Sequence, residues 1–319
     1  MLEVLLGVAG LAVGLGLLAI SSDRAVGHTV ELALALGLSP MITGLLIVSV
    51  GTDLPEIANS FLSAALGHAD VSIGDSFGSC LTQITLILGI LAIVGGNIRF
   101  DRDSVLTSGI LQALALVIAL SISQKGFITR IDAGLLVLTW ALAVILLRKT
   151  SPGEKGMPTA KATAPKRYLF NSVMAFVSYV GVWIGSFITI ESVIVLSPYL
   201  GIPEFLVSFF IVGIGTSLPE LVVDLSAIRK GQHELAIGDI IGSNLVDATL
   251  AVGLGPLFFP VPVTASAALA TGLYALIASL AAVGLLVFKG SLDRNAGILL
   301  LTVYAFSFVW VPVWMSLLS

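Results

Sequence analysis

Charge is scarce in this sequence, since only 11% of its 319 residues are Asp, Glu, Lys or Arg. Soluble domains carry roughly 25% charged residues, so the composition excludes an ordinary soluble domain. Apolar residues make up 57% of the chain and the mean hydropathy is +1.09, as in proteins that cross the membrane many times. The expected surrounding is therefore the lipid bilayer, and nothing in the sequence indicates nucleic acid or an obligatory protein partner.

Cysteine and histidine are also rare. The single cysteine, Cys80, cannot form a disulfide within the chain. The three histidines, His28, His68 and His233, fall in loops or at the ends of apolar segments and form no H-E-x-x-H signature. A Ser/Lys dyad and a paired catalytic Asp motif are missing too. We therefore expect a protein that is not an enzyme and that holds no resident cofactor.

Apolar segments of near 20 residues, the length that spans a bilayer, recur along the whole chain. They lie at about 3–20, 40–65, 71–95, 105–121, 131–147, 168–190, 204–227, 235–259, 264–287 and 296–316. This pattern predicts an all-α polytopic membrane protein with about ten transmembrane helices.

Two motifs recur at a constant offset of 164 residues. The sequence GTDLPE at 51–56 returns as GTSLPE at 215–220, and GDSFGS at 74–79 returns as GDIIGS at 238–243. The offset stays the same, without gaps, from the start of the first motif at residue 51 to the end of the second at residue 79. Such a constant offset indicates two homologous halves. We assign 1–147 to the first five-helix repeat, 148–167 to a polar linker with several Pro and Gly residues, and 168–319 to the second repeat.

The basic residues predict the orientation of the spans. If the linker is cytoplasmic, 13 of the 15 Lys and Arg residues face the cytoplasm, and only Lys125 and Arg130 face outside. This positive-inside bias places both termini outside a cell membrane that the chain crosses many times. Since five spans is an odd number, the second repeat is expected to be inverted relative to the first, as in many secondary transporters.

Acidic residues lie inside the predicted spans without basic partners. The stretches 40–95 and 203–228 contain no Lys or Arg, and the carboxylates within the spans are Asp53, Glu56, Asp75, Glu220, Asp224, Asp239 and Asp247. Such charges are costly in a membrane and usually mark a functional path. Asp224 is the exception, because its counterpart is Ser60 and a structural role explains it equally well.

Each GT-x-LPE motif combines a helix break with oxygen ligands. Pro55 and Pro219 have no N–H, so they leave carbonyl groups of the preceding turn without helical partners. Each copy thus offers free carbonyls, a Thr hydroxyl and a Glu carboxylate within one turn. Oxygen ligands of this kind suit a hard cation.

These paired motifs resemble the two alpha-repeats of the cation/calcium exchanger superfamily, and among its members they resemble the prokaryotic sodium/calcium exchanger branch. The resemblance covers the whole chain. It implies a secondary antiporter that exchanges calcium for sodium by alternating access, with the first and sixth helices sliding across the rest.

The resemblance also implies a set of ligands. Glu56 and Glu220 would bind calcium together with the carbonyls of Thr52 and Thr216. Sodium would be bound by the carbonyls of Ser49 and Gly213 and by the side chains of Asp53, Ser79, Ser217 and Ser243. Gln83 and Asp247 would stand at the middle position of this ion-binding site.

The sequence departs from the family pattern at four positions. Asp53 stands where Ser is common, Asp75 and Asp239 where Asn is common, and Gln83 where Asn is usual. The extra carboxylates could carry protons, so a proton/calcium antiporter remains an alternative. A calcium-permeable channel is an alternative from another class, because channels also use acidic rings. Broken helices in inverted repeats favour the antiporter.

Overall fold

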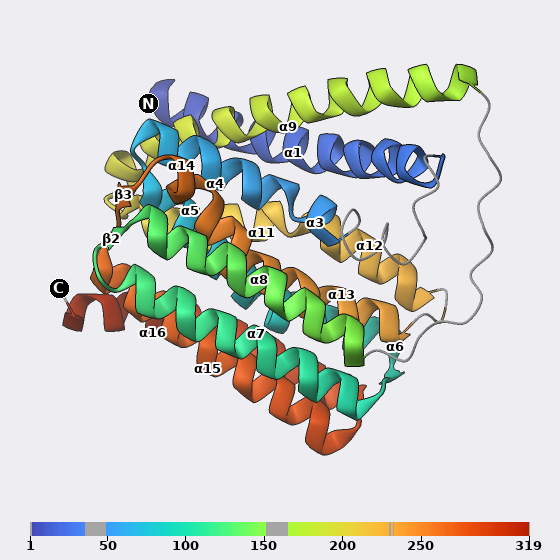
Figure 1. Cartoon of the computed structure of the whole chain (residues 1–319). Helices are drawn as coiled ribbons and strands as arrows, with labels where there is room; N and C mark the ends of the chain where they lie inside the picture. The colour runs from blue at the N-terminus through green and yellow to red at the C-terminus, as the bar shows by residue number, and fades with distance from the viewer. Residues whose placement is uncertain (1, 36–48, 151–164, 230, 232, 319) are drawn as a thin grey trace.

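The computed structural model describes residues 2–35, 49–150, 165–229, 231 and 233–318, and Figure 1 shows their arrangement as a bundle of helices. Nine of the described helices are long and apolar enough to cross a membrane, so the chain is an all-helical, multi-pass membrane protein. The predicted second span, 40–65, lies partly outside the described residues, and its remainder forms two consecutive short helices.

The first half consists of α1 (Leu2–Ala35), α3 (Ser49–Thr52), α4 (Leu54–Leu66), α5 (Ala69–Leu81), the π-helical turn η2 (Thr82–Ile87), α6 (Leu88–Gly95), β1 (Asn97–Arg99), α7 (Arg102–Ser123), β2 (Phe127–Ile128) and α8 (Arg130–Thr150). The second half consists of α9 (Pro165–Leu200), α10 (Glu204–Val207), η3 (Ser208–Val212), α11 (Gly213–Thr216), α12 (Leu218–Arg229), α13 (His233–Val246), η4 (Asp247–Ala251), α14 (Val252–Phe258), β3 (Val261–Pro262), α15 (Ala265–Lys289), β4 (Ser291–Asp293) and α16 (Arg294–Leu318).

The linker is shorter than 148–167, because α8 runs to Thr150 and α9 begins at Pro165. Proline is favoured in the first turn of a helix, where its missing N–H costs nothing. The prediction of a flexible linker falls on residues 151–164, which lie outside the described residues.

Helices α1 and α9 form a layer of their own along one side of the bundle (Figure 1). Glycines bring their backbones together. A Cβ built on Gly14 would lie 2.9 Å from the backbone nitrogen of Thr189, and one on Gly185 would lie 2.9 Å from that of Leu18. The two broken helices, α3–α4 and α11–α12, lie between this layer and α7, α8, α15 and α16 (Figure 1).

Short strands join the two halves at both ends of the bundle. β1 pairs antiparallel with β4, and β2 pairs antiparallel with β3. Large buried side chains such as Phe77, Phe205 and Phe209 fill the core, while many Leu, Ile and Val side chains are exposed on the outer helices. In a bilayer the lipid covers those side chains.

Candidate cation-binding site

Both GT-x-LPE motifs break their helices at the same relative position. α3 ends at Thr52 and α4 begins at Leu54, while α11 ends at Thr216 and α12 begins at Leu218. The two residues between them share one conformation, with φ −82° and ψ 14° at Asp53 and φ −81° and ψ 6° at Ser217. The sequence predicted these breaks from the prolines. One of the freed carbonyls is already used, because Ser22 Oγ of α1 donates to Gly51 O at 3.1 Å.

Three acidic side chains meet between the broken helices. Asp53, Glu56 and Asp247 each place a carboxylate oxygen within 4.8 Å of the other two, and all three are buried. Glu220 is fully buried as well and interacts electrostatically with Glu56 and Asp53. The structure therefore brings four carboxylates from α4, α12, η4 and the residue before α4 into one place.

Most of these carboxylate oxygens lack a hydrogen-bond donor. Within the described part of the chain, both oxygens of Asp53, Glu220 and Asp247 and one oxygen of Glu56 are buried and unpartnered. Carboxylates in such a place are stable only when a cation binds them or when a proton neutralises them. The donor set is all oxygen, which suits calcium or sodium rather than a softer metal.

Hydroxyl and carbonyl groups line the same place from both halves. Ser79 Oγ lies 3.3 Å from Glu56 Oε1, 3.2 Å from Thr216 Oγ1 and 3.4 Å from Gly213 O. Ser217 Oγ donates to Gly213 O at 2.8 Å. Ser243 is buried with its hydroxyl unpartnered among the described residues. Thr52 is buried too, and the side chain of Ser49 lies outside the described ones.

Asp75 and Asp239 stand at equivalent positions in the two halves, but their surroundings differ from each other. Asp75 accepts from Asn59 Nδ2 at 2.8 Å, and its other oxygen lies 2.9 Å from Thr216 Oγ1. Asp239 is only partly buried and faces Asp224, with which its carboxyl group interacts. Asp224 is fully buried and has no donor for either oxygen among the described residues. The sequence could not decide between a structural and a functional role for Asp224, because its counterpart in the first half is a serine.

Buried amides connect the site to neighbouring helices. Ser186 Oγ of α9 donates to Asn59 Oδ1 at 2.5 Å, so Asn59 joins α9 to Asp75. Asn244 of α13 contacts Gln83, and Gln112 of α7 contacts Asn244. Sequence reasoning missed Asn59, Gln112 and Asn244. The signal that could have found them is an uncharged polar residue in an apolar span, spaced so as to face a carboxylate.

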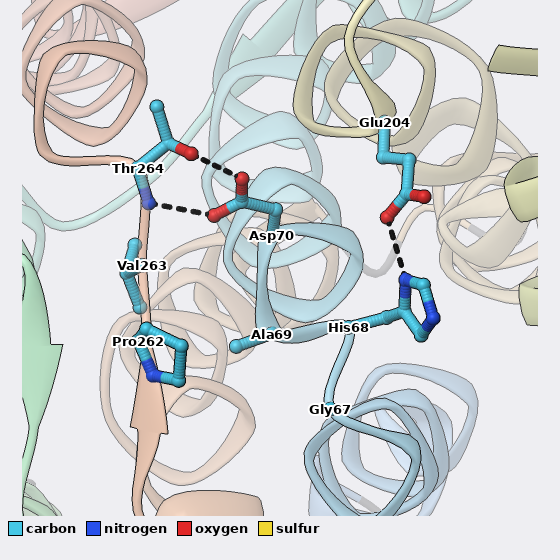
Figure 2. Close-up of a pocket in the computed structure, with 8 residues that line it drawn as sticks. All are labelled: Gly67, His68, Ala69, Asp70, Glu204, Pro262, Val263 and Thr264. Atoms are coloured by element: carbon cyan, nitrogen blue, oxygen red, sulfur yellow. Dashed lines mark hydrogen bonds and ion pairs between the residues drawn. The ribbon is translucent and has the colours of Figure 1, made fainter. Parts of the chain in front are cut away.

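Ion pairs lie at the ends of the bundle, away from the carboxylates. In the described residues they join His68 to Glu204, Lys125 to Asp132 and Lys289 to Asp293. His68 and Glu204 border a pocket of about 250 Å³ that Asp70 and Thr264 also line. Figure 2 shows Asp70 turned toward Thr264 and His68 turned toward Glu204. No predicted ligand lines this pocket, so it is separate from the candidate site.

Comparison with known proteins agrees with this geometry. Inner membrane protein YrbG of Escherichia coli K12 is 30% identical over 275 residues, which cover 80% of this chain and 81% of the relative. Sodium/calcium exchanger MaX1 of Methanosarcina acetivorans is 26% identical over 295 residues, covering 79% and 83%. A solved structure of the sodium-calcium exchanger NCX_Mj soaked with Na⁺ and Sr²⁺ superposes with a TM-score of 0.65 at 28% identity, covering 96% of this chain and 98% of that one.

The family model described as sodium/calcium exchanger protein matches residues 6–149 and again residues 170–313. The matched segments contain both pairs of motifs and all of the clustered carboxylates. They also confirm the expectation of a membrane transporter of inorganic cations rather than an enzyme. The chain belongs to the sodium/calcium exchanger protein family.

Proposed function

We propose that this protein is a secondary antiporter that moves calcium across the cell membrane in exchange for sodium. The observation that carries the proposal is the buried cluster of Asp53, Glu56 and Asp247, whose ligand atoms lie within 4.8 Å of one another. Sodium and calcium have similar radii and both prefer oxygen ligands, so one cluster can hold either ion in competition.

In this proposal the two glutamates balance one calcium ion. Glu56 and Glu220 are its charged ligands, and the carbonyls of Thr52 and Thr216 complete the shell. The sodium ligands are the carbonyls of Ser49 and Gly213 and the side chains of Asp53, Ser79, Ser217 and Ser243. Gln83 and Asp247 stand at the middle position. Support comes from the unpartnered carboxylate oxygens and from the contact of Ser79 with both Glu56 and Gly213.

Alternating access would come from a movement of α1 and α9 across the rest of the bundle. Both helices lie in a separate layer (Figure 1), and each donates a hydrogen bond from a hydroxyl group to the broken helix α3–α4. Ser22 of α1 donates to Gly51 O, and Ser186 of α9 donates to Asn59. A movement of α3 or α4 can therefore be transmitted to both long helices through these two hydrogen bonds.

The coupling ion depends on whether the extra aspartates, Asp53, Asp75 and Asp239, are protonated, and the contacts of Asp75 bear on this. Thr216 has one hydroxyl hydrogen but contacts both Val212 O at 3.1 Å and Asp75 Oδ1 at 2.9 Å. The carbonyl can only accept, so a proton on Asp75 would let both contacts be hydrogen bonds at once. A neutral Asp75 acts like the asparagine common in the family, and we therefore propose sodium as the coupling ion.

The test uses protein in liposomes loaded with sodium, with pH clamped equal on both sides by an ionophore. We expect radiolabelled calcium uptake that requires the sodium gradient. Uptake that ignores sodium and follows an imposed pH gradient would establish the proton antiporter instead, and Asp75→Asn and Asp239→Asn should then weaken proton coupling most. Calcium flux without any countergradient would establish a channel.

A further inference from the structure

Ser22 of α1 and Ser186 of α9 are counterparts in the two halves, because the same 164 residues separate them as separate the paired motifs. Both serines are fully buried, and each donates a hydrogen bond to another helix. Serine and threonine inside a helix commonly bond the carbonyl four residues earlier, as Thr189, Ser192 and Ser197 of α9 do. Ser22 and Ser186 instead tie the two long helices to their neighbours.

The two serines bond to the same broken helix. Ser22 Oγ donates to Gly51 O of α3 at 3.1 Å, and Ser186 Oγ donates to Asn59 Oδ1 of α4 at 2.5 Å. Asn59 is held from its other end, because its Nδ2 donates to Asp75 Oδ2 of α5 at 2.8 Å. Asn59 is therefore an acceptor whose place does not depend on Ser186, and the element that this bond holds in place is α9.

The second half offers only one of the two acceptors. By the offset of 164, the counterpart of Gly51 is Gly215, and the counterpart of Asn59 is Val223. The glycine has a backbone carbonyl that can accept a hydrogen bond in either half. Valine has no polar side-chain atom, so the bond between Ser186 and Asn59 has no equivalent in the other half.

This difference matters if the two halves exchange their arrangements during transport. In a protein built from two inverted halves, the site opens to the other side when each half takes the arrangement that its counterpart had. Ser186 then replaces Ser22 and meets the carbonyl of Gly215. Ser22 replaces Ser186 and meets Val223, which cannot accept its hydrogen. One hydrogen bond is preserved in the exchange, and the other is lost.

We propose that Ser186 is a positioning residue for α9, whose bond to Asn59 biases the exchanger toward the arrangement of helices in Figure 1. A buried hydrogen bond present in one of two states shifts their equilibrium about tenfold. The bias makes the apparent calcium affinity differ between the two sides of the membrane, although the ligands are the same. This inference rests on the proposed function and on the inverted arrangement expected from the sequence.

The test measures the half-saturating calcium concentration on each side of the membrane, with the protein inserted into liposomes in one orientation. The apparent affinity on either side is scaled by the fraction of protein open to that side, so the ratio of the two concentrations reports the equilibrium. We expect Ser186→Ala to change this ratio about tenfold, with the two concentrations moving in opposite directions. An unchanged ratio, or two concentrations that rise or fall together, would overturn the proposal, because damage to the ligands acts on both sides alike.

A second variant tests the exchange of arrangements. Val223→Asn supplies the acceptor that Ser22 lacks in the opposite state, so it should change the ratio in the same direction as Ser186→Ala. In a Ser22→Ala background that acceptor has no donor, and Val223→Asn should then change the ratio by less than about twofold. A change in the opposite direction, or one that persists without the Ser22 hydroxyl, would contradict the proposal.

Ser192→Ala is the matched control, because it removes a hydroxyl of α9 that donates to Ile188 O of the same helix. It should leave both concentrations at their parental values. Failure of the parent protein to exchange calcium for sodium would refute the proposed function. A parent that exchanges the two ions, with a ratio that Ser186→Ala does not change, would refute only this inference.

Discussion

Buried carboxylates without basic partners destabilise a membrane protein until something compensates them. The four acidic groups of the site cannot all be ionised while no cation is bound, because each unpaired buried charge costs several kcal/mol. Among the described residues, no Lys or Arg pairs with them, and the basic residues that form ion pairs do so at the ends of the bundle. A bound cation therefore contributes to stability as well as to transport.

Replacement of either glutamate should nearly abolish exchange. Glu56→Gln and Glu220→Gln each remove one negative ligand while they keep the shape of the side chain. The loss of one charge from a buried divalent site should lower calcium affinity by about two decades or more. Calcium binding to purified protein and uptake into liposomes would measure the effect.

Glu204→Gln is the matched control, because Glu204 is only partly buried and pairs with His68 beside a pocket that none of the predicted ligands lines. It should leave calcium affinity at the parental value. If both site variants bind calcium within about threefold of the parent, the paired-glutamate site is wrong.

At this scale the sequence predicted the acidic ligands but not their supports. Glu56 and Glu220 were recognisable because they recur beside the same broken helix. Asn59, Gln112 and Asn244 were not, because an isolated amide in an apolar span has no repeated pattern around it. Asp75 lies 16 residues from Asn59 in the chain, and Asn244 lies 132 residues from Gln112. Only the packing of α4, α5, α7 and α13 brings them together.

Among the helices, close packing depends on glycine. The motif glycines Gly74 and Gly78 lie under the backbone of η3 and its neighbour, where an added Cβ would be 2.5 Å from Phe205 O and 2.2 Å from Phe209 O. A Cβ added to their counterparts, Gly238 and Gly242, would meet no described neighbouring atom within 4 Å.

The contact between α1 and α9 gives a prediction for Gly14. An alanine there would place its Cβ 2.5 Å from Thr189 Oγ1 and 3.0 Å from Gly185 O, so the two helices must move apart. Overpacking of this kind typically costs about 1–3 kcal/mol. We expect Gly14→Ala to lower the unfolding temperature in detergent and to slow exchange.

Gly16 provides the control on the same helix, since nothing in the described structure lies within 4 Å of an added Cβ. Gly16→Ala should be neutral or stabilising by up to about 1 kcal/mol, because alanine favours helix. If the two variants have the same unfolding temperature and the same exchange rate, α1 and α9 do not pack as closely as described.

For the whole molecule, composition and the length of the apolar segments predicted the class and most of the spans. They could not predict the strand pairs that join the halves, because strands of two or three residues leave no periodic pattern. Both ends of the chain lie at the same end of the bundle, opposite the ends of α8 and α9 that flank the linker (Figure 1). Which of these ends faces the cytoplasm is a prediction from the basic residues alone.

Cysteine labelling would test that orientation. Gln124, at the end of α7, and Asn295, in the first turn of α16, are exposed at opposite ends of the bundle. An impermeant thiol reagent added outside intact cells should modify Gln124→Cys and not Asn295→Cys. Cys80 is fully buried, so the parent protein supplies the background. Labelling of Asn295→Cys alone would reverse the proposed topology.

The length of α1 and α9 has a consequence for the bilayer itself. Their apolar spans contain 27 and 33 residues, or about 40 and 50 Å of helix at 1.5 Å per residue. A hydrocarbon core is about 30 Å thick, so these helices must tilt or locally thicken the membrane. If they slide while the other helices stay fixed, the mismatch changes during each cycle. The exchanger would then respond to acyl-chain length, and the lipid would set part of the barrier to transport.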